Sequence, residues 1–295
     1  MLPGFIVVGA SRSGTTTLHQ ALSEHPSLFL PKKKELHFFN NTKNFNRGLG
    51  YYEKSFKQSK PHQVAGEISP PYFHKGITLD ARLKYHWDVA DDSAIRIRRL
   101  MPDTKLIFTL RNPVDRAFSQ YVKNFSQGKD MASSFEEAVA LELSGRRAPE
   151  KDQSCWLYKS SYSQHIDHWL SLFPKEQTLF LIFEEWTKEP ESAFAKVYDF
   201  LGVESNGVKH DHLQVANAAR ARKTRGVFRL LAPVRSSSLL GKLHRKLATT
   251  PSHGSSSPTP ETRRKLNDYF KEDIDALEKI LDLPLDIWRC GETLA

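Results

Sequence analysis

A short turn near the start of the chain combines glycines, a cation and hydroxyl groups at spacings that suit phosphate chemistry. Residues 9–16 read GASRSGTT, so Arg12 lies inside a turn that glycines bound, and Thr15 and Thr16 follow. Such a turn before a helix directs backbone N–H groups toward one point and predicts a cradle for a phosphate. Because Thr15 stands where a nucleotide-binding P-loop has its lysine, the positive charge comes from Arg12 instead. A purely structural turn of small residues is the alternative interpretation.

A second concentration of charge lies in the last third of the sequence. Residues 209–250 contain ten lysines and arginines, among them Arg222, against one acid, and this surplus equals the whole net charge of +9. A local positive field attracts an anion such as a nucleic acid, an anionic polysaccharide, a membrane surface or a phosphorylated cofactor. Residues 209–260, basic and then rich in serine and proline, have the composition of a partly mobile lid. An ordinary solvated surface is the alternative.

Strands and helices are expected to alternate along the chain, with the turn between the first of each. Short apolar runs predict strands at residues 4–8, 63–68, 105–110 and 178–183. Helices are predicted at residues 15–25, 114–125, 190–201 and 260–281. This order predicts an α/β fold with a P-loop-like central parallel sheet flanked by helices, in a single domain that covers residues 1–295.

Composition narrows the class of protein further. No apolar run approaches the ~18 residues of a membrane-spanning helix, and no basic segment precedes the first apolar run as it would in a signal peptide. The two cysteines predict neither a disulfide framework nor a zinc site. We therefore expect a cytoplasmic protein without a transmembrane segment or a resident metal. The sequence leaves the oligomeric state open.

The turn resembles the phosphosulfate loop of the sulfotransferases that use 3′-phosphoadenosine-5′-phosphosulfate (PAPS). Their loop has the form K/R-x-G-T-[T/S], which corresponds here to residues 12–16. The resemblance implies PAPS as donor and 3′,5′-ADP as product. It assigns the 5′-phosphosulfate to the loop residues Arg12, Ser13, Gly14, Thr15 and Thr16.

A second signature of that family follows the strand expected at residues 105–110. Its pattern R-[D/N]-P-x-x-R-x-x-S-x-Y corresponds to residues 111–121 (RNPVDRAFSQY). The resemblance implies that Arg111 and Ser119 bind the 3′-phosphate of the donor. A simple ion pair between Arg111 and Asp115 is the alternative.

A third segment is similar to the glycosaminoglycan branch of the same family. Residues 34–39 (KELHFF) match its K-E-x-H-F-F pattern, whose glutamate is the catalytic base, and this implies Glu35 as base with His37 second. Without the resemblance, a salt-bridge partner for the lysines at 32–34 is the favoured interpretation of Glu35. His37, beside two phenylalanines, is equally a half-buried structural histidine.

The resemblance covers roughly residues 4–204 and includes two departures from the family pattern. Arg12 replaces the usual lysine of the loop, and position 68 also differs. Residues 67–73 (EISPPYF) are similar to E-K-[TS]-P-x-Y, but Ile68 replaces a lysine that related enzymes place near the transferring group. The usual basic phosphate loop near the carboxyl end is not recognisable. We suggest that the cluster at residues 220–225, with Arg222, replaces it.

Sulfuryl transfer makes the same demands on these residues as phosphoryl transfer does. It is an in-line displacement through a loose transition state, catalysed by positioning and charge stabilisation. Arg12 and the loop N–H groups can stabilise charge on the bridging oxygen of the leaving 5′-phosphate, and Glu35 can accept the proton of an acceptor hydroxyl. The sequence therefore predicts a sulfotransferase acting on a hydroxyl or amine of a carbohydrate, small-molecule or lipid acceptor.

Two other classes of protein remain open at this point. A P-loop kinase using ATP is disfavoured by the missing lysine at position 15 and by the lack of an evident magnesium-binding aspartate. A basic module that binds nucleic acid or a membrane explains residues 209–250 but none of the three motifs. We therefore expect no nucleic-acid partner.

Overall fold

The computed structural model describes residues 1–79, 85–88, 90–148, 154–205, 207–208 and 257–289, and these form two compact units. The first unit draws on residues 1–112, 161–216 and 272–295, and the second on residues 113–160 and 217–271. Arg222 and the predicted lid up to residue 256 lie outside the described residues. The single domain expected for residues 1–295 stays a prediction.

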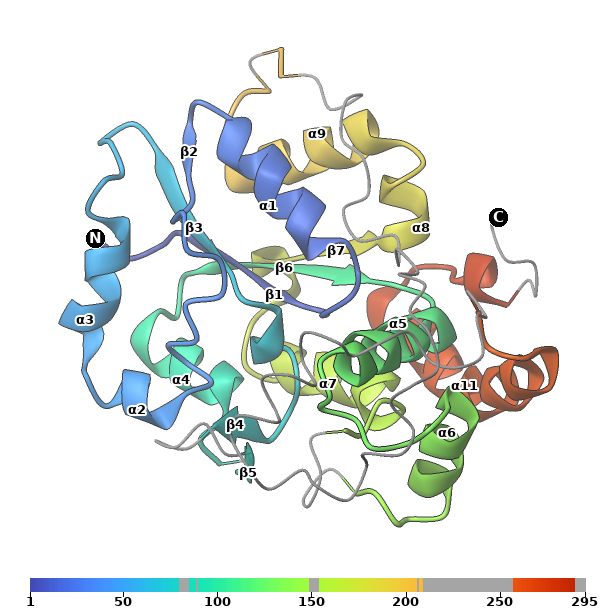
Figure 1. Ribbon diagram of the computed structural model, residues 1–295. Coiled ribbons are helices and arrows are strands. Elements are labelled where there is room, and N and C mark those ends of the chain that lie inside the picture. Colours follow the sequence, from blue (N-terminus) through green and yellow to red (C-terminus); the bar gives the residue numbers. More distant parts are fainter. Residues whose placement is uncertain (80–84, 89, 149–153, 206, 209–256, 290–295) are drawn as a thin grey trace. The chain divides into compact units, whose positions relative to one another are not determined.

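A five-stranded parallel sheet forms the centre of the first unit (Figure 1). In spatial order its strands are β2 (Leu28–Phe29), β3 (Val64–Ile68), β1 (Phe5–Gly9), β6 (Lys105–Leu110) and β7 (Thr178–Ile182). All of β1 is buried, as is β6 after its first residue, which is typical of parallel strands covered on both faces. The predicted α/β class is confirmed. The two-residue strand β2 was not predicted, because it is too short to show a pattern.

Helices cover both faces of this sheet. In Figure 1, α1 (Thr15–Glu24), α8 (Phe183–Trp186) and α9 (Pro190–Leu201) lie on one side, and α4 (Ser93–Leu100) and α7 (Ser163–Leu170) on the other. The first side shares one apolar core, in which Leu18 and Val197 pack with Val7. On the other side, Trp169 of α7 meets Phe108 of β6 with ring centroids 5.8 Å apart.

Short elements complete the first unit. Helices α2 (Thr42–Phe45) and α3 (Leu49–Glu53) follow the segment that leaves β2, and β4 (Ile77–Leu79) pairs antiparallel with β5 (Tyr85–Trp87). One glycine in the sheet is required by packing, because a Cβ on Gly66 would lie 2.0 Å from Cζ of Phe5 on the neighbouring strand.

The second unit is helical in the part that the structure describes. It contains α5 (Pro113–Ser126), α6 (Phe135–Leu143) and the first half of α11 (Pro260–Leu281), which passes to the first unit at Glu272. Phe135 of α6 packs against α5, with its ring centroid 5.2 Å from that of Phe118. No helix among the described residues is long and apolar enough to cross a membrane. The predicted helices are confirmed, whereas α4, α6 and α7 were not predicted.

Candidate active site

The turn between β1 and α1 contains a buried hydroxyl and leads directly into the amino-terminal end of a helix. Arg12 and Gly14 have left-handed φ angles of 75° and 80°, and a Cβ on Gly14 would lie 2.2 Å from Cζ2 of Trp186. The first N–H groups of α1 have no partner within the helix. Ser13 Oγ is fully buried, and no described residue forms a hydrogen bond with it. An oxyanion would satisfy such donors.

Two buried side chains hold this turn in place. Thr109 of β6 donates its hydroxyl to the carbonyl of Ser13 at 2.8 Å. Trp186 of α8 donates its indole N–H to Thr109 Oγ1 at 3.0 Å. The turn is therefore fixed to the sheet before any ligand binds, which is what preorganised charge stabilisation requires.

An ammonium group reaches the turn from another part of the chain. Lys34 Nζ donates to Thr16 Oγ1 at 3.0 Å and to Thr15 Oγ1 at 3.3 Å. The turn lacks the P-loop lysine at position 15, but Lys34 brings a positive charge to the same two hydroxyls. This role of Lys34 was not predicted from the sequence. The available signal was the position of Lys34 directly before the candidate base.

Glu35 and His37 lie beside this ammonium. Glu35 Oε1 is 3.9 Å from Lys34 Nζ, and Glu35 Oε2 is 3.7 Å from His37 Nε2. The expected salt bridge with a neighbouring lysine is thus present, but it is longer than a hydrogen bond. The side chains of Glu35 and His37 keep 35% and 36% of their surface exposed, so an acceptor can reach both. Lys34, which contacts both the loop and Glu35, therefore links the two predicted bases to the loop.

The backbone that carries these two bases is held in an unfavourable conformation. Glu35 and His37 have φ angles of 61° and 53°, in the left-handed region that costs a non-glycine residue roughly 1–2 kcal/mol. Such a conformation persists only where the surroundings enforce it. Part of the enforcement is a hydrogen bond of 3.2 Å from the N–H of Glu35 to the carbonyl of Ile68, at the end of β3.

A buried carboxylate at the end of β3 supports the same segment. Glu67 accepts hydrogen bonds from four donors, which are the hydroxyls of Tyr52, Ser69 and Tyr72 and the N–H of Leu36. Tyr72 passes the support on, because its hydroxyl also accepts the N–H of Phe38 at 2.8 Å. The backbone on both sides of His37 is therefore held by Glu67, directly at Leu36 and through Tyr72 at Phe38. No role was predicted for Glu67 from the sequence.

Burial sets the protonation of this cluster. It raises the pKa of Glu67, while the hydroxyl and N–H donors oppose that shift. It also raises the pKa of Tyr52 and Tyr72 well above the usual value, and the charge of Glu67 adds to the effect. Both tyrosines therefore stay protonated and remain donors to the carboxyl group.

Removing the Tyr72 hydroxyl is expected to lower kcat, because the segment that carries Glu35 and His37 is displaced. Tyr72→Phe leaves the N–H of Phe38 without its buried partner, which costs about 1–3 kcal/mol. A displacement of ~1 Å at a reacting group lowers rates up to ~10²-fold. We expect a fall in kcat of this order, measured by steady-state kinetics, with unchanged affinity for 3′,5′-ADP.

The same substitution elsewhere separates positioning from general destabilisation. Tyr198→Phe changes another buried tyrosine, which lies in α9 within the apolar core. It should leave kcat close to that of the unmodified protein. Equal losses of kcat in both variants would contradict a positioning role for Tyr72.

Arg111 brings a second guanidinium to the turn. Its Nη1 donates to the carbonyl of Arg12 at 3.4 Å, and its Cζ lies 4.8 Å from the ring centroid of Phe183. Burial lowers the pKa of Arg12, and the nearby positive charge of Arg111 lowers it further. Two cations held this close to each other favour an anionic ligand. The alternative partner, Asp115, binds Arg263 at 2.5 Å in the second unit.

Three sequence expectations have different outcomes. Ser119 lies half-buried on α5 in the second unit, so its joint action with Arg111 on one phosphate stays a prediction. Arg222 lies outside the described residues. Ile68 is 2% exposed and belongs to the apolar core, so this position presents no charge to the loop. In the described part of the chain, no group of three or more potential metal ligands occurs.

Comparison with known proteins identifies the family. The sulfotransferase domain family matches residues 2–227, and the chain belongs to it. Human heparan sulfate glucosamine 3-O-sulfotransferase 6 is 31% identical over 201 residues, which cover 68% of this chain and 52% of that protein. The human 3B1 enzyme of the same name is 31% identical over 204 residues, covering 68% and 46%. The chain thus spans about half the length of these relatives.

The fold has a solved counterpart. A sulfotransferase from Alicyclobacillus acidocaldarius superimposes with a TM-score of 0.68 and 25% sequence identity, over 98% of this chain and 99% of that one. The similarity confirms the resemblance inferred from the motifs and the architecture of the sheet.

Proposed function

We propose that this protein transfers a sulfuryl group from PAPS to a hydroxyl group of a carbohydrate. The observation that carries the proposal is that Arg111 and Lys34 reach the loop of Arg12, in which the buried hydroxyl of Ser13 has no hydrogen-bond partner among the described residues. Family membership supports the reaction class. The names of the human relatives support a carbohydrate acceptor and O-sulfation, which the sequence left open against N-sulfation.

The residues at the loop fit a phosphosulfate donor. Ser13 Oγ and the N–H groups at the start of α1 would bind oxygens of the 5′-phosphosulfate, together with Arg12 and Lys34. PAPS supplies a sulfuryl group on a good leaving group, so the protein needs to stabilise charge rather than to create a strong nucleophile. Arg111 would bind the 3′-phosphate, as the family resemblance implies.

Glu35 performs the proton transfer in this proposal. Its carboxylate accepts the proton of the acceptor hydroxyl as the new S–O bond forms. The bond between sulfur and the bridging phosphate oxygen breaks, and that oxygen keeps the electron pair. Arg12 and Lys34 stabilise the negative charge that develops there. His37, 3.7 Å from the carboxylate, helps to orient it.

A titration separates this function from its rivals. We expect calorimetry to show tight binding of 3′,5′-ADP and weak binding of ATP and of a DNA oligonucleotide. Radiolabelled PAPS incubated with a heparan sulfate acceptor should give a labelled polymer. Tight, magnesium-dependent binding of ATP instead of 3′,5′-ADP would favour a kinase, and binding of the oligonucleotide alone would favour a nucleic-acid module.

Arg111 should distinguish donors that carry a 3′-phosphate from those that do not. Loss of a charge-assisted hydrogen bond costs ~1.5–3 kcal/mol. Arg111→Ala is therefore expected to lower the affinity for 3′,5′-ADP by about 10- to 150-fold in calorimetry. The affinity for 5′-AMP should remain almost unchanged. Equal weakening of both nucleotides would refute the 3′-phosphate role.

Lys34 should behave as part of the loop although it is remote from it in sequence. Lys34→Ala removes a charged donor from Thr15 and Thr16, and we expect kcat to fall by ~10-fold or more. Lys32→Ala is the matched control, because Lys32 is exposed in the same segment. Steady-state rates with saturating PAPS provide the comparison. Similar rates for both variants would show that Lys34 is only a surface cation.

A further inference from the structure

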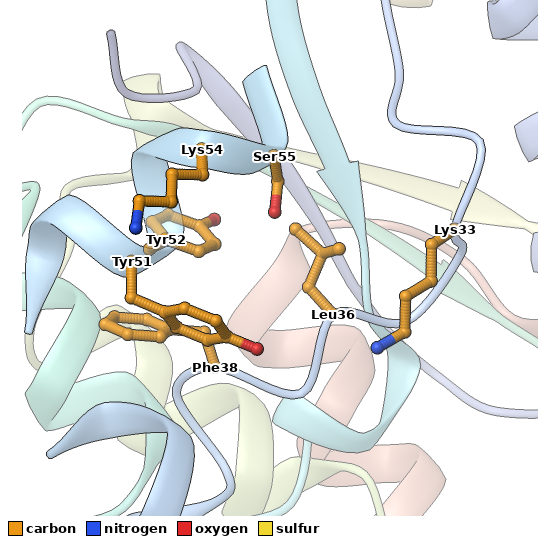
Figure 2. A pocket seen from close by; sticks show the side chains of 7 residues that line it. All are labelled: Lys33, Leu36, Phe38, Tyr51, Tyr52, Lys54 and Ser55. Carbon is orange, nitrogen blue, oxygen red and sulfur yellow. The ribbon is translucent and has the colours of Figure 1, made fainter. Parts of the chain in front are cut away.

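A small pocket adjoins the segment that carries the candidate base. It has a volume of about 200 Å³ and lies between that segment and the helical turns of residues 49–56. The residues that line it are Lys33, Leu36, Phe38, Tyr51, Tyr52, Lys54 and Ser55 (Figure 2). All of them belong to the first unit.

The lining combines apolar side chains with cationic and hydroxyl groups. Leu36, Phe38 and the ring of Tyr52 provide apolar surface, and the last two rings are stacked with centroids 4.5 Å apart. Figure 2 shows the amine of Lys33 and the hydroxyl of Tyr51 pointing toward each other across the pocket. None of the lining residues is acidic. The pocket is therefore suited to an anionic group attached to a ring that can pack on an apolar surface.

The tyrosine at the rim is itself held by a cation. Cζ of Arg47 lies 3.4 Å from the ring centroid of Tyr51, in a cation–π contact that fixes the ring. This guanidinium places a positive charge against the ring of Tyr51, while Lys33 and Lys54 line the pocket itself. The two lysines that line the pocket therefore come from two separate segments of the chain.

The pocket and the catalytic segment share their backbone. Lys33 and Leu36 line the pocket, while the two residues between them are Lys34 at the loop and the candidate base Glu35. The N–H of Leu36 is bonded to Glu67, which also fixes the pocket residue Tyr52 through its hydroxyl. A ligand in the pocket would therefore be held at a fixed offset from the base.

We propose that this pocket is an acceptor subsite that binds one anionic substituent, a carboxylate or a sulfate, of the carbohydrate. The inference rests on the proposed sulfuryl transfer and adds the means by which the acceptor is oriented. Lys33 and Lys54 bind the anion, Tyr51 and Ser55 donate hydrogen bonds, and the sugar ring packs on Leu36. The hydroxyl that reaches Glu35 is then determined by its distance from the bound substituent.

The test measures acceptor binding directly, with donor binding as a separate readout. The probes are octasaccharides of heparan sulfate, of unsulfated N-acetylheparosan, which retains only carboxylates, and of its carboxyl-reduced, uncharged derivative. Calorimetry in the presence of 3′,5′-ADP compares the unmodified protein with the double variant Lys33→Ala/Lys54→Ala. Lys57→Ala/Lys60→Ala is the matched control, because it removes the same charge from exposed lysines that do not line the pocket.

We expect Lys33→Ala/Lys54→Ala to lower the affinity for the heparan sulfate octasaccharide by at least 10-fold. The control variant should change this affinity by less than 2-fold. A similar loss with N-acetylheparosan identifies the carboxylate as the ligand, and a loss confined to heparan sulfate identifies the sulfate. The uncharged octasaccharide should bind both proteins equally. The proposal is overturned if neither charged probe binds the unmodified protein, or if the two double variants lose equal affinity. Failure of 3′,5′-ADP to bind would instead count against the proposed function.

Discussion

Replacement of Glu35 by glutamine is expected to lower kcat by about 10²- to 10⁴-fold, the range for loss of a general base. The amide has the shape of the carboxylate but does not accept the acceptor's proton at neutral pH. The fold should be retained, because the backbone contacts of residue 35 do not involve its side chain. Single-turnover measurements with saturating PAPS would isolate the chemical step from product release.

Donor binding provides the control for this variant. Glu35→Gln should bind 3′,5′-ADP at least as well as the unmodified protein, because a negative charge near Lys34 has been removed. Turnover at the normal rate would exclude Glu35 as the base. His37→Asn would then be the next variant to examine, since His37 is the other group at the same place.

Replacement of Arg12 by alanine is expected to lower turnover by ~10²-fold or more, the scale for removal of one oxyanion donor. The guanidinium is half-buried in the turn and close to Arg111, so water replaces it poorly. The loss should be larger in kcat than in the affinity for 3′,5′-ADP, because charge develops on the bridging oxygen only as the sulfuryl group leaves.

A conservative variant makes this prediction specific. Arg12→Lys carries the residue that the related loops use and keeps the positive charge, so it should retain substantial activity. A left-handed φ of 75° is available to lysine as readily as to arginine, so the backbone is not a reason for failure. Normal turnover of Arg12→Ala would show that the loop does not bind the phosphosulfate.

The parts of the site that could be predicted from the sequence are those that depend on local order. The turn with Arg12 follows directly from a strand and precedes a helix, so spacing alone indicates its geometry. Glu35 and His37 lie within one short motif. The strand at 105–110 has the apolar character that burial on both faces requires. The apolar run at 178–183 forms β7, a partly buried strand at the edge of the sheet.

The contacts that were not predicted join segments far apart in the sequence. Lys34, in the segment after β2, meets Thr16 at the start of α1, and Glu67 near the end of β3 supports Leu36. Residue types do not reveal such pairings, because a lysine beside a glutamate looks like a surface ion pair. A glutamate in an apolar strand becomes informative only when its donors, such as Tyr72, are known to surround it.

The left-handed backbone at Glu35 has a consequence for attempts to make this protein more robust. Glycine adopts that conformation without the side-chain penalty, so Glu35→Gly relieves part of the roughly 1–2 kcal/mol stored there. A screen that rewards heat resistance alone would therefore enrich a change that removes the base. Selection for a heat-resistant enzyme therefore needs to measure turnover at every round, because a substitution at this position can raise stability and remove activity.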